Sequence, residues 1–93
     1  MKTKLLIFVA VLFPFIGSAQ AIAKKDSLKY YKFQAEAQFD MVGDYATTIY
    51  WLNKAIRLDP KDDELYLIRA FSKGRLEDWK GREADYTVVI NLD

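Results

Sequence analysis

Gly43-Asp44-Tyr45 and Glu77-Asp78-Trp79 lie 34 residues apart in this chain, and the residues that follow keep the same spacing. Apolar residues then match apolar residues, in the pairs Leu52 and Tyr86, Ile56 and Ile90, and Leu58 and Leu92. Self-similarity at such a period is typical of stacked helical hairpins, which cannot bury their apolar faces alone. Their stacking leaves an extended surface that binds other chains. The repeat therefore predicts an all-α protein of two stacked antiparallel helical hairpins.

The N-terminus has the residue order of a secretory signal peptide. Lys2 and Lys4 precede an apolar stretch, residues 5–16, and small residues follow it over 17–21. This order of charge, apolar core and small residues marks an exported leader. We predict a signal peptide over residues 1–21, cleaved after Ala19 or after Ala21. The chain is then exported to the periplasm, the cell surface or the extracellular space.

An uncleaved membrane anchor is the alternative interpretation of the same segment. No charged residue occurs over the 19 residues from Leu5 to Ala23, and a spanning helix needs about 20 mainly apolar residues. Pro14 interrupts the apolar part, and its last residues are small or polar. These features favour a cleaved leader, so we predict no stable membrane insertion after cleavage.

The composition of residues 22–93 argues against several classes of function. Lys2 and Lys4 are the leader's only basic residues, so twelve of the 14 basic residues remain, against 13 acidic ones. A nearly neutral chain has no electrostatic footprint for nucleic acid. The chain has no cysteine and no histidine, which removes thiol chemistry and the commonest general base and metal ligand. We therefore predict no enzyme activity, no catalytic residue, no metal site, no cofactor and no nucleic-acid partner.

Apolar periodicity and turn residues predict four helices, at about residues 27–41, 45–58, 63–75 and 79–91. Their expected N-caps are Asp26 or Ser27, then Asp44, then Asp62 or Asp63, and then Asp78. Gly43 ends the first helix, because glycine adopts a positive φ without strain. Pro60 ends the second helix, because proline cannot donate a backbone hydrogen bond. Connections of two to four residues make neighbouring helices antiparallel.

These residues resemble the tetratricopeptide repeat family, and with the leader they resemble an exported bacterial member of it. The first unit matches through Gly43-Asp44-Tyr45 and residues 51–60, the second through Tyr66, Ala70 and residues 76–79 and 85–93. The resemblance implies a repeat domain over 22–93, with repeat one at about 29–62 and repeat two at about 63–93. It implies a non-catalytic scaffold that binds a protein or peptide segment in a concave face. Glu36, Arg82 and Val89 depart from the family's small residues.

By this resemblance, the first helix of each hairpin lines the partner-binding groove. The implied positions are Tyr30, Phe33, Ala37, Asp40 and Met41 in unit one, and Glu64, Leu67, Phe71, Gly74 and Arg75 in unit two. We expect Phe33 and Phe71 to contribute most of the apolar contact with a partner. The alternative is that Phe33, Leu67 and Phe71 pack between the hairpins, and this is the favoured interpretation because apolar residues at helical spacing are usually core.

The tryptophans and the acidic residues have structural interpretations. Trp79 aligns with Tyr45 and is expected to pack at the hairpin turn. Trp51 aligns with Asp85, and its place on an outer face or against Tyr50 stays open. The acidic residues Asp59, Asp62, Asp63 and Glu64 lack the alternating spacing and glycine of a calcium loop, so capping explains them. The carboxylate pairs Glu83 with Asp85 and Glu77 with Asp78 are expected to face solvent, because such close neighbours on a helix do not converge.

Two repeats are fewer than the three that such arrays usually need, and the last helix has no polar capping helix after it. We expect either a longer chain or self-association through the last helix. Two alternative functions remain: an exported sensory module of a longer signalling protein, or an accessory module of an envelope enzyme. The sequence does not identify the partner.

Overall fold

A computed structural model describes the backbone of residues 2–93 and the side chains of residues 19–93. All the regular secondary structure of the described chain is helical, with no strand, which confirms the all-α prediction. Its elements are α1 (Lys2–Ala37), the π-helix η1 (Gln38–Val42), α2 (Tyr45–Leu58), α3 (Asp63–Arg75) and α4 (Trp79–Leu92). Most of the predicted signal peptide, residues 1–21, lies outside the residues whose side chains are described. Among the described residues, no helix combines the length and the apolarity that crossing a membrane requires.

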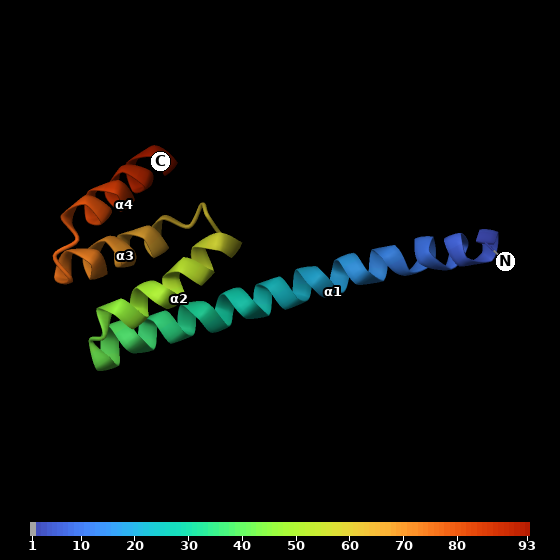
Figure 1. The fold of residues 1–93 in the computed structure, drawn as a ribbon, viewed down its shortest axis with the longest axis horizontal. Helices are drawn as coiled ribbons and strands as arrows, with labels where there is room; N and C mark the ends of the chain where they lie inside the picture. The colour runs from blue at the N-terminus through green and yellow to red at the C-terminus, as the bar shows by residue number, and fades with distance from the viewer. Residues whose placement is uncertain (1) are drawn as a thin grey trace.

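Consecutive helices run antiparallel and pack side by side (Figure 1). α2 folds back along the C-terminal part of α1, α3 packs on α2, and α4 packs on α3. The first two helices thus form one hairpin and the last two form another. α2 and α3 make the main junction between the hairpins.

The helix boundaries follow the predicted turns with one exception. α2 and α3 begin and end where the sequence predicts, and α4 is one residue longer. α1 begins at Lys2, so Asp26 and Ser27 lie inside a continuous helix and the prediction that one of them caps it is wrong. The reason lies in residues 19–25, which hold alanine, glutamine, isoleucine and lysine and no glycine or proline to stop the helix.

Aspartates cap the three later helices as the sequence predicts. The Asp44 carboxylate accepts hydrogen bonds from the Thr47 backbone N–H at 3.1 Å and from the Thr47 hydroxyl at 2.7 Å. Asp62, rather than Asp63, caps α3 by accepting from the Glu64 N–H at 3.2 Å. Asp78 accepts from the Gly81 N–H at 3.0 Å. Each bond satisfies a first-turn amide that has no partner within its helix.

The two hairpin turns share an unusual backbone conformation. Gly43 has a φ of 73°, as expected for a glycine that ends a helix. Glu77, which matches Gly43 in the repeat, has a φ of 64° although it carries a side chain. The second turn therefore adopts the conformation of the first at a steric cost that glycine avoids.

The π-helix η1 changes the register of the first hairpin. Its wider turn accommodates one extra residue between the buried Ala35 and Asp44, compared with the stretch between the buried Ala70 and Asp78. The equivalent residues of α1 and α3 are therefore 35 apart, whereas those of the turns are 34 apart. This corrects the assignment of Glu36 to the small-residue position: Ala35 occupies it, and Glu36 is exposed.

The core lies where the two hairpins meet. Ala35 of α1, Leu52 and Ala55 of α2, and Leu65 of α3 form one buried cluster. Half-buried residues close around it: Leu28, Tyr31, Trp51, Ile56 and Ile68. Most of the core thus joins α1, α2 and α3, and α4 contributes none of its apolar side chains to it.

Candidate functional site

Four of the predicted groove residues lie together on the first hairpin. Phe33, Ala37, Asp40 and Met41 line a hollow of about 200 Å³ with Glu36, all on α1 and η1. Phe33 is 65% exposed and Met41 is 84% exposed. The favoured interpretation that Phe33 packs between the hairpins is therefore wrong.

The second hairpin has a hollow of its own between α3 and α4. It measures about 260 Å³ and is lined by Phe71, Gly74, Arg75, Trp79, Arg82 and Tyr86. Three of these belong to the predicted groove, namely Phe71, Gly74 and Arg75. The hollow thus combines aromatic rings with two guanidinium groups, whereas the first hollow combines apolar side chains with two carboxylates.

Phe71 has two roles at once. Its ring makes edge contacts with Phe39 at 5.4 Å and with Tyr45 at 6.1 Å between centroids, and these contacts join the hairpins. The side chain is still 47% exposed, so its other face is open to a partner. The prediction that Phe71 packs between the hairpins therefore holds for one part of the side chain, and the other part is exposed.

The remaining predicted residues lie elsewhere. Tyr30 joins an aromatic cluster with Tyr31 and Trp51. Glu64 lines a cavity of about 120 Å³ between the hairpins, and Leu67 is exposed on α3. The structure therefore distributes the predicted residues over separate hollows and does not bring them into one groove.

A glycine explains how Arg82 replaces the small residue that the repeat pattern implies. A Cβ atom added at Gly74 would lie 3.1 Å from Arg82 Cδ, so the arginine stem occupies the space above this glycine. The guanidinium then lies 4.8 Å from the Trp79 ring, a cation–π geometry. Arg82 Nε is buried and has no hydrogen-bond partner among the described residues.

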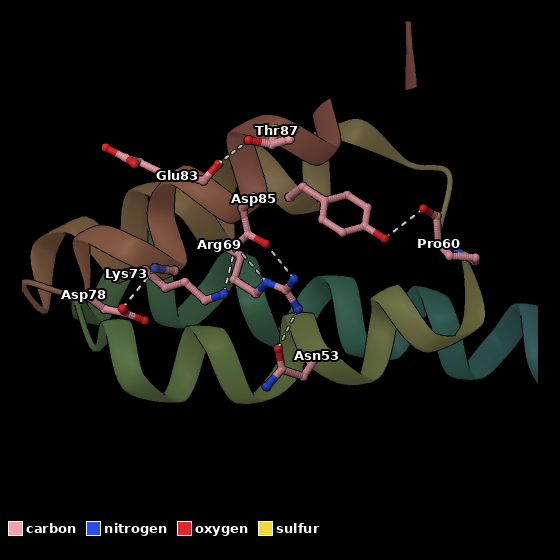
Figure 2. A network of polar contacts seen from close by, with 10 residues as sticks. Asn53, Pro60, Arg69, Lys73, Asp78, Glu83, Asp85 and Thr87 are labelled. Atoms are coloured by element: carbon pink, nitrogen blue, oxygen red, sulfur yellow. Dashed lines mark hydrogen bonds and ion pairs between the residues drawn. The ribbon is translucent and has the colours of Figure 1, made fainter. Parts of the chain in front are cut away.

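The charged network around Asp85 was not expected from the sequence (Figure 2). The carboxylate is almost fully buried and accepts two hydrogen bonds from Arg69, from Nη2 at 2.7 Å and from Nε at 2.9 Å. Lys73 Nζ lies 3.1 Å from the same carboxylate, and Arg69 Nη1 donates to Asn53 Oδ1 at 2.9 Å. The prediction that Asp85 faces solvent is thus wrong.

This network joins three helices through one side chain. Arg69 of α3 reaches Asn53 on α2 and Asp85 on α4, and its guanidinium also lies 5.4 Å from the Tyr66 ring. Tyr66 in turn donates its hydroxyl hydrogen to the Pro60 carbonyl at 2.8 Å. Because every oxygen of Asp85 is engaged, we assign the network a structural role in holding α4 to the rest of the fold. The sequence does carry a signal for this network. Asp85 occupies the position in repeat two that Trp51 occupies in repeat one, and Arg69 and Lys73 lie one helical turn apart on α3.

The tryptophans lie in different surroundings. Trp51 is half-buried among Tyr30, Tyr31 and Tyr50, with ring centroids 5.1 to 6.0 Å away. Trp79 begins α4 as Tyr45 begins α2, but it is 52% exposed, whereas Tyr45 is covered by Phe71. The two equivalent aromatic residues therefore differ because α3 covers Tyr45, whereas no described helix covers Trp79.

One ion pair connects the hairpins at the opposite end from Phe71. Lys32 Nζ donates to Asp62 Oδ2 at 2.8 Å, and this hydrogen bond raises the pKa of Lys32 although partial burial opposes the shift. Asp62 thus caps α3 and binds α1. Within the described residues, no three His, Cys, Asp or Glu side chains are grouped so that they can hold a metal ion.

The class that the fold defines is an all-α chain of two antiparallel helical hairpins. Comparisons of this chain with protein-family models, with curated proteins and with solved structures find no match. Function is therefore argued from the two hollows and from the exposed residues around them.

Proposed function

We propose that the chain is a non-catalytic, exported protein-interaction module of tetratricopeptide-repeat type that binds a partner protein or peptide. The observation that carries this proposal is the exposed Phe33 on α1, which lies beside a hollow with Glu36 and Asp40 on its rim. An exposed apolar patch with polar neighbours is a common mark of a protein-binding surface.

The two phenylalanines are the expected anchors of this surface. Phe33 is largely exposed and lies outside the described core cluster, so its removal leaves that cluster intact. Phe71 presents its free face beside Arg75 in the second hollow. Aromatic side chains of this kind supply much of the free energy of binding at protein interfaces.

Capture by a double variant tests the proposal. The tagged full chain, its Phe33→Ala/Phe71→Ala variant and a Tyr50→Ala control are used as baits in an extract of the bacterial envelope. Tyr50 is a matched control because it is an exposed aromatic residue outside both hollows. We expect a specific protein to be retained by the wild type and by the control, and lost by the double variant.

Folding of the variants must be measured in parallel. Loss of two aromatic contacts at Phe71 is expected to cost about 1 to 3 kcal/mol, so the fold should survive. Equal helicity by circular dichroism then separates binding from stability. Retention of the same proteins by the double variant, or its unfolding, contradicts the proposal.

A further inference from the structure

We propose that copies of this chain associate head to tail, with the exposed face of α1 in one copy packing against the exposed face of α4 in the next. This inference rests on the proposed protein-binding function and names a second copy as the partner. The reason is that α2 and α3 pack against each other inside the chain, and the residues equivalent to their contacting faces lie exposed on α4 and α1 in the described chain.

The internal junction shows which residues such a contact uses. α2 contributes Tyr45, Leu52 and Ile56, which are half-buried or buried. α3 contributes Leu65 and Phe71, with the Phe71 ring 6.1 Å from that of Tyr45. These contacts join one hairpin to the next.

The α2 half of the junction recurs on α4. At the 34-residue spacing, Tyr45, Leu52 and Ile56 correspond to Trp79, Tyr86 and Ile90. The contrast in burial is large, because Leu52 is 1% exposed whereas Ile90 is 71% exposed. We call Trp79, Tyr86 and Ile90, with the neighbouring Arg75 and Arg82, the tail surface. No helix covers this surface in the described chain.

The α3 half of the junction recurs on α1. At the 35-residue spacing set by η1, Leu65, Ile68 and Phe71 correspond to Tyr30, Phe33 and Glu36. Tyr30 and Phe33 are both more than half exposed. We call Tyr30, Phe33, Glu36, Ala37 and Asp40 the head surface.

The charges of the two hollows support a head-to-tail contact. Glu36 takes the place of Phe71 in the head surface, and Asp40 lies one turn further along on the same hollow. The tail hollow holds Arg75 and Arg82 around Trp79, and Arg82 Nε has no hydrogen-bond partner among the described residues. Two carboxylates therefore meet two guanidinium groups when a head surface meets a tail surface. Tail against tail would bring guanidinium groups together, which costs binding free energy. The head face is mixed in charge beyond its own hollow, because Lys25, Lys29 and Lys32 line an adjoining hollow with Phe33 and Glu36, so charge argues against the tail-to-tail contact only.

Such a contact is heterologous, because two different surfaces meet. The copies can therefore form chains longer than two, in which each junction repeats the α2–α3 packing. An apolar centre with a charged rim is the expected composition of such an interface.

Cysteine cross-linking tests the arrangement, and the natural chain has no cysteine to interfere. Phe71 and Tyr45 are in contact at the internal junction. Their equivalents are Glu36 on the head surface and Trp79 on the tail surface, so Glu36→Cys and Trp79→Cys place the two thiols at the predicted contact. Full chains with one substitution each, and tags of different size, are co-expressed and treated in cells with a permeant bismaleimide. We expect cross-linked dimers between the two variants and none between two copies of the same variant. A chain with both substitutions should give a ladder of dimers, trimers and longer species.

The control pairs Glu36→Cys with Lys61→Cys in the exposed turn between α2 and α3, and it should give no dimer. A second measurement protects against a misfolded variant. Arg75→Glu in the Trp79→Cys chain should reduce the yield of mixed dimer roughly tenfold, and Asp40→Arg in the Glu36→Cys chain should restore it. Rescue by the exchanged charges requires a direct contact between the two surfaces.

Three outcomes overturn the inference: no cross-link between the two variants, dimers of Trp79→Cys with itself, or equal yields with the Lys61→Cys control. None of these outcomes affects capture of another protein through Phe33 and Phe71, so the failure of self-association and the failure of the proposed function are distinguishable.

Discussion

Replacing Asp85 by alanine should destabilise the fold by about 3 kcal/mol. Its carboxylate is 3% exposed and pairs with Arg69 and Lys73, so its loss leaves a guanidinium partly buried without its counter-charge. Removing one partner of a buried ion pair costs about 3 to 5 kcal/mol. The lower end applies here because Arg69 keeps its hydrogen bond to Asn53 and is 17% exposed, and Lys73 is 20% exposed.

This loss is large compared with the stability of a small domain, which is about 5 to 15 kcal/mol. Urea unfolding of the purified chain, followed by far-ultraviolet circular dichroism, measures the free energy of unfolding by linear extrapolation. A Trp51→Phe background leaves Trp79 as the one tryptophan, since the chain has two. Its fluorescence then reports whether α4 detaches before the rest of the fold.

A double variant is the matched control. Arg69→Met with Asp85→Leu replaces the two most buried charges with apolar groups, a change that is often neutral or stabilising for buried pairs, and Lys73, 20% exposed, keeps access to solvent. Asp85→Asn keeps the size of the side chain and removes its charge, so it should fall between the wild type and Asp85→Ala. If Asp85→Ala costs less than about 1 kcal/mol, or if the double variant is as unstable as the single one, the network does not hold α4 as argued.

Three further changes test the turns and caps. Glu77→Gly should stabilise the chain by about 0.5 to 1 kcal/mol, because glycine relieves the positive φ, and a loss of stability in urea would contradict this. Gly81→Ala should lower the melting temperature despite alanine's helix propensity, because the new Cβ would overlap the Asp78 carboxylate and lie 2.9 Å from Lys73 Cδ; an increase in melting temperature would refute the steric argument. Hydrogen bonds from Thr47 hold the pKa of Asp44 below its ordinary value of 3.8, so its contribution is present above about pH 4 and is lost as the pH falls through the folded-state pKa. Asp44→Asn should flatten the acid limb of the stability curve, and an unchanged limb in pH titrations would exclude this carboxyl as its source.

The fold was largely predictable because local chemistry determines its turns. Gly43, Pro60 and the capping aspartates set the boundaries of α2 and α3 from the sequence alone. The register of α1 was not predictable in the same way, because nothing in residues 38–42 announces a π-helix and the extra residue shows only in the backbone. The start of α1 was missed because a capping residue does not stop a helix whose preceding residues also favour it.

The candidate site was predictable in part. The exposed Phe33 and Met41 and the hollow beside them involve residues that the family resemblance implies for the groove. The basic hollow on the second hairpin was missed, since Arg82 was seen only as a departure from the small residue of the family. Its position over Gly74 and Trp79 depends on contacts between helices, which no spacing along one helix reveals.

The π-helical turn at Gln38–Val42 has a consequence for length variation. Its wide turn takes up one residue more than the corresponding stretch of the second hairpin, and Ala35 still lies in the core. We therefore expect an insertion or deletion of one residue at this corner to leave Ala35 buried. An alignment of the two repeats at a constant spacing of 34 residues therefore shifts every residue of α1 by one position. Such an alignment assigns the exposed Glu36 to a buried position that Ala35 occupies.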